Sequence, residues 1–126
     1  MSVPTDRKYL SSHEWHKLEG DTVTIGITQQ AADELTDITF VNLPKVGQTL
    51  TAGKTFGEIE SVKATSDLYT GVTGEVSAIN ADLNNNPGVV NTDPFGAGWM
   101  IKVKVKNAGE LDKLLAADAY EKASGH

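Results

Sequence analysis

Short runs in which apolar and polar residues alternate, each soon interrupted by turn residues, restrict the fold of this chain most. Residues 22–28 read TVTIGIT, which places Val23, Ile25 and Ile27 on one face of a strand. Residues 100–106 read MIKVKVK, so three apolar side chains face one way and three lysines the other. Such a strand is typical of an antiparallel sheet with one solvated face. We interpret the lysines as that solvated face or as protection of a sheet edge.

Further strands and two peripheral helices follow from the same pattern. Strands are expected at residues 14–18, 37–43, 54–62, 68–72 and 75–79, because Pro44 and closely spaced glycines separate them. One helix is expected over residues 29–35 with Thr28 as its N-cap. A C-terminal helix is expected after Asn107, because Glu110, Leu111, Leu114 and Leu115 follow at helical spacing. Residues 84–88, NNNPG, are expected to form a loop or one irregular turn. The pattern predicts a mainly β protein, a β-sandwich or flattened barrel.

Length and charge narrow the class of protein. The 126 residues fit one domain, residues 1–126, which is large enough to bury a core without disulfides or a structural metal. No cysteine is present, which excludes thiol nucleophiles, disulfides and cysteine-ligated zinc. The formal charge is −6 and the lysines are scattered, so we expect neither nucleic acid nor an anionic membrane as a partner. With no apolar leader or spanning segment, we expect a soluble, cytoplasmic bacterial protein, or a mitochondrial matrix protein if this is a mature eukaryotic form.

No catalytic or metal site emerges from the residues. The segment TLTAGKT, residues 49–55, resembles a phosphate-binding loop, but Gly47 is one residue too far from Gly53 and a strand follows. His13 and His16 would point to opposite faces of a strand, which favours structural or surface roles over metal binding. There is no G-x-S-x-G nucleophile motif. We therefore expect a protein that is not an enzyme.

One lysine remains unexplained by these exclusions. Residues 58–69 read EIESVKATSDLY, with Lys63 as the only basic residue where an apolar strand ends in a turn. Such a lysine could be a solvated charge, a phosphate ligand, a general base or an acceptor for a covalent group. A lysine at a hairpin end on a rigid β scaffold suits a carrier whose tethered group visits other active sites. Spacing alone favours an ordinary surface lysine.

Six blocks of the sequence form a recognisable set. They are SHEW at 12–15, TIGIT at 24–28, VNLPKVG at 41–47, ESVKATSDLY at 60–69, GEV at 74–76 and VNTDPFGAGWMIKVK at 90–104. They run along nearly the whole chain, and those around Lys63 and residues 93–101 are highly specific. Together they resemble the H protein of the glycine cleavage system.

The resemblance implies a lipoyl carrier with a barrel-sandwich hybrid fold, a flattened barrel of two antiparallel sheets. Lipoic acid would be attached to Lys63 by a lipoate ligase or octanoyltransferase, within a motif formed by Glu60, Ser61, Val62 and Ala64. The carrier, expected to be a monomer, would serve three enzymes. These are a pyridoxal-phosphate-dependent glycine decarboxylase, a tetrahydrofolate-dependent aminomethyltransferase and dihydrolipoyl dehydrogenase. The resemblance also makes Ser12, Glu14 and Asp67 candidates for docking the loaded arm.

Two residues depart from the family pattern, and other functions stay open. Gly71 stands where a proline is usual, and Thr36 stands where a glycine is common. The main alternative is a lipoyl carrier or lipoate donor for another pathway. A 2-oxoacid dehydrogenase domain is disfavoured because SHEW and NTDPFGAGW lie outside a minimal lipoyl domain. A biotin carrier is disfavoured because no methionines flank Lys63, and a non-carrier interaction domain would leave Lys63 unmodified.

Overall fold

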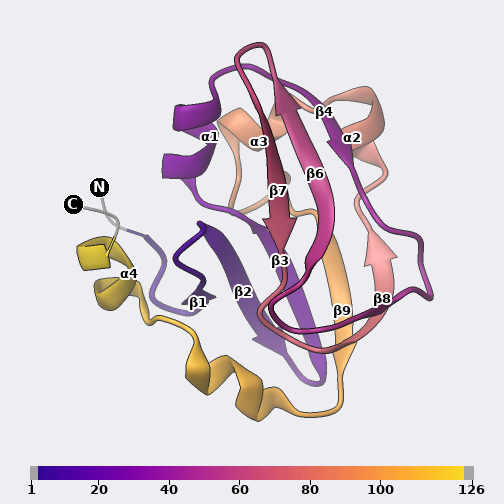
Figure 1. Ribbon diagram of the computed structural model, residues 1–126, viewed down its shortest axis with the longest axis vertical. Coiled ribbons are helices and arrows are strands. Elements are labelled where there is room, and N and C mark those ends of the chain that lie inside the picture. Colours follow the sequence, from indigo (N-terminus) through magenta and orange to yellow (C-terminus); the bar gives the residue numbers. More distant parts are fainter. Residues whose placement is uncertain (1–2, 124–126) are drawn as a thin grey trace.

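The structure, a computed structural model, describes residues 3–123. Two antiparallel sheets form the body of the protein (Figure 1). The six-stranded sheet has the order β1 (Lys8–Tyr9), β2 (Glu14–Glu19), β3 (Thr22–Ile27), β9 (Ile101–Val105), β8 (Gly74–Ile79) and β5 (Thr49–Leu50). The three-stranded sheet has the order β4 (Ile38–Asn42), β6 (Thr55–Ser61) and β7 (Thr65–Tyr69). The predicted fold class, mainly β with two antiparallel sheets and short helices, is confirmed.

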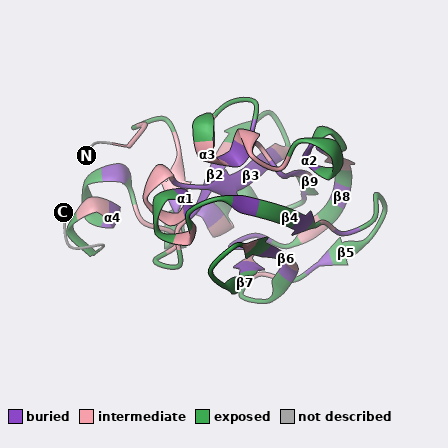
Figure 2. Ribbon diagram, turned by 90° about the horizontal axis from the view of Figure 1, so that it is seen from above, coloured by how far each residue is buried: buried purple, intermediate pink, exposed green. Residues whose placement is uncertain are grey.

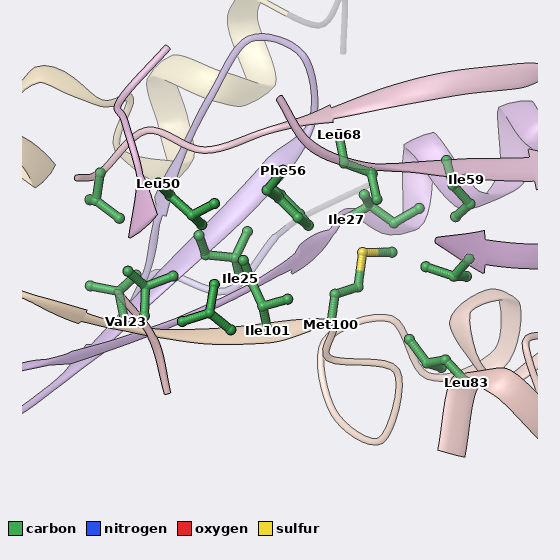
Figure 3. Packing of buried hydrophobic residues seen from close by; sticks show 14 of the residues in the cluster. Val23, Ile25, Ile27, Leu50, Phe56, Ile59, Leu68, Leu83, Met100 and Ile101 are labelled. Atoms are coloured by element: carbon green, nitrogen blue, oxygen red, sulfur yellow. The ribbon is translucent and has the colours of Figure 1, made fainter. Parts of the chain in front are cut away.

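The main core fills the space between the two sheets. Val23, Ile25 and Ile27 of β3 are at most 3% exposed, as their alternation predicted. They pack with Phe56 and Leu68 of the smaller sheet (Figure 3). Each such side chain contributes about 1.5–3 kcal/mol by leaving water. In β4, Ile38 and Val41 are buried and the other three residues are exposed (Figure 2), because the pairing register with β6 shifts between Ile38 and Phe40.

Short helices cover the ends of the sheets. Helix α1 (Gln29–Leu35) begins as predicted, because the Thr28 side chain accepts a hydrogen bond from the Ala31 amide. Helix α2 (Asp82–Asn85) takes up residues 84–85 of the expected loop, residues 86–88 form a turn as predicted, and α3 (Val89–Thr92) follows. The two helices bury Leu83 and Val90. In the described part of the chain, no helix has the length and apolar character needed to cross a membrane.

The C-terminal region differs from its prediction. After Asn107 the chain forms a 3-10 helix (Ala108–Lys113) rather than an α-helix, and the true C-terminal helix is α4 (Ala117–Ala123). The leucine spacing was misleading because Leu115 pairs with Tyr9 through two backbone hydrogen bonds of 2.8 Å. That pairing holds the chain extended between the two helices.

Two strand predictions also need correction. β7 spans residues 65–69 and not 68–72, because the turn before it is tight and pairing with β6 resumes at Thr65. β9 lies inside the larger sheet, between β3 and β8, so its lysines do not protect an edge. They form a solvated face, on which the Lys102 Nζ lies 5.2 Å from the centre of the Trp99 ring.

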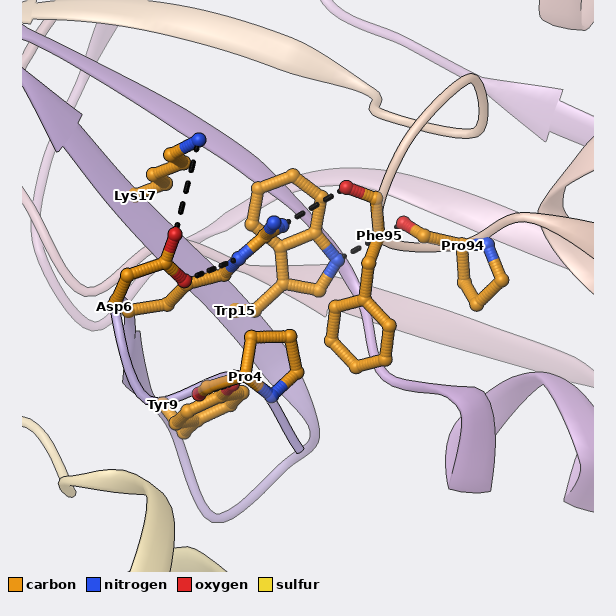
Figure 4. Close-up of polar contacts among 8 residues, drawn as sticks. Pro4, Asp6, Tyr9, Trp15, Lys17, Pro94 and Phe95 are labelled. Atoms are coloured by element: carbon orange, nitrogen blue, oxygen red, sulfur yellow. Dashed lines mark hydrogen bonds and ion pairs between the residues drawn. The ribbon is translucent and has the colours of Figure 1, made fainter. Parts of the chain in front are cut away.

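A second, aromatic cluster joins the two ends of the described chain to β2. Tyr9, Trp15, Ala117 and Tyr120 are its buried members. Trp15 Nε1 donates to the Pro94 carbonyl at 3.0 Å (Figure 4). The Arg7 guanidinium lies 4.5 Å from the Trp15 ring centre. The cluster fixes the start of β2, and with it residues 12–15.

Candidate functional site

Lys63 lies in the turn that joins β6 to β7, at the top of Figure 1. The Ser61 amide donates to the Ala64 carbonyl at 2.8 Å and closes the turn. The Ser61 hydroxyl oxygen then accepts from the amides of Lys63 (3.2 Å) and Ala64 (3.0 Å). Serine often orders turns in this way. The backbone of Lys63 is therefore fixed while its side chain is exposed.

The Lys63 side chain reaches from this turn towards α1. Its Nζ donates to the Glu34 carbonyl at 2.9 Å, in the last turn of the helix, where carbonyls lack partners within the helix. The Val62 amide donates to the Asp37 carbonyl at 3.0 Å, which holds the turn against the segment after α1. Lys63 thus lies at the mouth of the space between α1 and β7.

That space is a cleft of about 300 Å³. Apolar side chains from β3, α1, β6 and β7 line one part: Ile27, Ala31, Leu35, Ile59 and Leu68. Polar residues line the rest: Ser12, His13, Glu14, Glu34, Lys63, Ser66 and Asp67. The structure therefore brings Lys63 together with all three predicted docking candidates, although they come from segments far apart in the sequence. The other residues of the predicted acceptor motif, Glu60, Ser61, Val62 and Ala64, are not in the cleft lining.

Glu14 is buried in the wall of this cleft. Its Oε1 accepts from the Ser12 hydroxyl at 2.5 Å, and its Oε2 accepts from the Tyr69 amide at 2.8 Å. Burial raises the pKa of Glu14 to about 7, and the two hydrogen bonds oppose that shift only in part. Near neutral pH the carboxyl is therefore poised between its two protonation states.

His16, two residues further along β2, supports the turn after β7. Its Nε2 accepts from the Gly71 amide at 2.9 Å, and burial lowers the pKa of His16 to about 4, so the ring is neutral near pH 7. A proline at position 71 could not donate this hydrogen bond. The glycine in place of the usual proline thus has a partner in this chain. Sequence reasoning missed the pair because 55 positions separate its members.

His13 precedes β2 with a φ of +84°, so only His16 of the two histidines lies on a strand. Its Nδ1 lies 2.6 Å from the Tyr120 hydroxyl oxygen, which is also 2.8 Å from the Thr28 hydroxyl. Within residues 3–123, no three histidine, aspartate or glutamate side chains gather to hold a metal ion. Both histidines make specific contacts inside the protein.

The cleft suits a tethered aliphatic group that ends in a cation. An arm attached at Lys63 would extend over the apolar side chains, and a cationic end would find the Glu14 and Asp67 carboxylates. Charge-assisted hydrogen bonds of this kind are about twice as strong as neutral ones. The donor and acceptor set therefore fits an acylated lysine that carries an amine.

Comparisons with known proteins agree on one family. The family model described as "Glycine cleavage H-protein" matches residues 7–126. A glycine cleavage system H protein from Bordetella pertussis is 50% identical over 125 residues, covering 99% of this chain and 100% of the relative. A probable H protein from Haloarcula marismortui is 52% identical over 120 residues, covering 95% and 94%. The crystal structure of an H protein from Mycobacterium marinum matches with a TM-score of 0.90 at 39% identity, covering 98% of this chain and 100% of that one.

Proposed function

Because this chain belongs to the glycine cleavage H-protein family, we propose that Lys63 carries lipoic acid through an amide bond. H proteins are the lipoyl-bearing carrier components of the glycine cleavage system. The observation that carries the proposal is the position of Lys63. Its Nζ lies at the mouth of a cleft that combines an apolar lining with the buried carboxyl of Glu14.

Each part of the cleft has a task in this proposal. When bound, lipoic acid supplies a dithiolane that accepts the aminomethyl group of glycine. Ile27, Leu35 and Leu68 cover the aliphatic part of the arm and exclude water from it. Ser12, Glu14 and Asp67 hold the amine of the cargo, and a docked ammonium favours the ionised form of Glu14.

The arm links this chain to three enzymes in turn. Glycine decarboxylase loads the aminomethyl group, the tetrahydrofolate-dependent aminomethyltransferase unloads it, and dihydrolipoyl dehydrogenase reoxidises the dithiol. A lipoate ligase or octanoyltransferase modifies Lys63 beforehand. The chain acts as one monomeric carrier domain, residues 1–126, without catalysis of its own. Its compartment is the bacterial cytoplasm, or the mitochondrial matrix in a eukaryote.

Intact mass spectrometry tests the modification. Incubation with a lipoate ligase, ATP and lipoic acid should add one lipoyl group, and fragmentation should locate it on Lys63. An increment on another lysine, or none, contradicts the proposal.

Lys63→Arg tests the carrier role. The variant keeps the charge but cannot form the amide, so glycine–bicarbonate exchange with the decarboxylase should disappear while the circular dichroism spectrum stays unchanged. Exchange at the wild-type rate without added lipoate would mean that no tethered arm is needed.

A further inference from the structure

Three elements meet at the hydroxyl of Tyr120, which lies behind the cleft. Tyr120 belongs to α4 and is 1% exposed. Its oxygen is 2.6 Å from His13 Nδ1 and 2.8 Å from Thr28 Oγ1. His13 belongs to the segment that supplies Ser12 and Glu14 to the cleft, and Thr28 caps α1, the helix on the opposite side. One hydroxyl from the C-terminal helix therefore contacts the start of both walls.

The contacts around Tyr120 favour one direction for the hydrogen bonds. Thr28 Oγ1 accepts from the Ala31 amide at 3.4 Å, so its proton is free to go to the Tyr120 oxygen. The Tyr120 proton then goes to His13 Nδ1. The reverse direction would leave the Thr28 proton without any acceptor among the hydrogen bonds of the described residues. The series of hydrogen bonds thus runs from the Ala31 amide through the Thr28 and Tyr120 hydroxyls to His13. It requires the His13 tautomer with its proton on Nε2.

We propose that the Tyr120 hydroxyl is a positioning group, which holds the His13 ring and the cap of α1 together and so sets the shape of the cleft. The backbone bond from the Thr28 amide to the His13 carbonyl, at 2.9 Å, already joins the two segments. Tyr120 adds the orientation of the ring, in a turn whose positive φ is uncommon for residues other than glycine. The effect of this role on a bound aminomethyl group rests on the proposed function.

Tyr9 provides a matched control for Tyr120. Both tyrosines are buried, and their rings stack with centres 4.9 Å apart. The Tyr9 hydroxyl, however, donates to the Pro4 carbonyl, and these two residues lie together in Figure 4. Pro4 is not part of the cleft lining. Removing either hydroxyl perturbs the same aromatic cluster, but only the change at Tyr120 removes the hydrogen bond to His13.

The first experiment loads lipoylated protein with the aminomethyl group and follows the spontaneous release of ammonia and formaldehyde. Tyr120→Phe should release them about two- to tenfold faster than wild type, the factor that one net hydrogen bond supplies. Tyr9→Phe should release them at the wild-type rate. Equal rates for Tyr120→Phe and wild type overturn the inference, as does equal acceleration by both variants. If Tyr120→Phe does not fold, the tautomer of His13 in unmodified wild type, measured in the second experiment, decides the inference.

The second experiment needs no lipoate and so separates this inference from the proposed function. In unmodified wild type at pH 8, the ¹⁵N shifts of the His13 ring should show a protonated Nε2 and an accepting Nδ1. Tyr120→Phe should give averaged shifts of two tautomers, while Tyr9→Phe should keep the wild-type spectrum. A mixed tautomer in wild type overturns the inference. If Lys63 accepts no lipoate, the proposed function fails and this measurement still decides the role of Tyr120.

Discussion

At the scale of single residues, Glu14 and His16 show how one buried strand can shift two groups in opposite directions. Burial disfavours the charged form of both, which raises the pKa of Glu14 to about 7 and lowers that of His16 to about 4. The contribution of Glu14 to the free energy of unfolding is fully present below pH 4.5, the pKa of the group in the unfolded chain, and it is lost as the pH rises through 7. The contribution of His16 to the free energy of unfolding is fully present above pH 6.5, the pKa of the group in the unfolded chain, and it is lost as the pH falls towards 4. The two effects offset each other.

Glu14→Gln should uncover the effect of His16. We expect the free energy of unfolding of wild type to change little between pH 4.5 and 7, because the two linkages have opposite signs. In the variant it should rise with pH over this range by up to about 3 kcal/mol, since one pKa unit corresponds to about 1.4 kcal/mol. Urea denaturation at half-unit pH steps measures both curves. Parallel curves would show that the carboxyl of Glu14 has an ordinary pKa.

The same substitution tests the docking role proposed for Glu14. Loaded wild type should release its aminomethyl group faster as pH falls through the pKa of Glu14, which a docked ammonium places below the value of about 7 in the unloaded protein, because a protonated carboxyl no longer attracts the ammonium. Glu14→Gln, with lipoylation intact, should release it faster than wild type at pH 8 and show no such pH dependence. Assays of ammonia and formaldehyde give the rates. Identical behaviour of the two proteins would remove Glu14 from the site.

At the scale of elements, sequence patterns predicted the strands and the helix whose formation depends on residues close together in the sequence. Alternation and glycine spacing located β2, β3 and β9, and the Thr28 cap located α1. The motif around Lys63 could be read for the same reason, because it is contiguous. The 3-10 helix was missed because Leu115 pairs with a strand more than a hundred residues away. His16 and Tyr120 were missed likewise, since their partners are distant in sequence.

The junction between α1 and β4 contains a residue in an unfavourable conformation. Thr36 has φ +63° and ψ −147°, a region that glycine tolerates and a β-branched residue does not. The Asn91 side chain holds it there by donating to the Thr36 carbonyl at 2.7 Å. The glycine common in the family at this position would remove the strain.

Thr36→Gly should therefore stabilise the protein by about 1 kcal/mol, the relief of strain less the extra entropy of an unfolded glycine. Thr39→Gly is the control, because Thr39 lies in β4 and a glycine there should destabilise. Thermal unfolding should give shifts of opposite sign. A loss of stability in Thr36→Gly would show that position 36 is not strained.

At the scale of the whole molecule, the proposed modification changes the net charge. The formal charge of −6 becomes −7 when acylation turns the Lys63 ammonium into a neutral amide. Native isoelectric focusing should therefore resolve the modified protein at a lower isoelectric point. Lys63→Arg should give one band before and after treatment with the ligase. A shift in that variant would place the modification elsewhere.

The position of Lys63 between β6 and β7 also bears on how the protein is degraded. It is the only basic residue between Lys54 and Lys102. A trypsin-like protease that cuts there would separate the two strands of the hairpin, as peptides 55–63 and 64–102. An acylated lysine is not cleaved by such proteases, so the modified chain keeps residues 55–102 in one piece. The bond that attaches the arm would thus protect the hairpin that displays it.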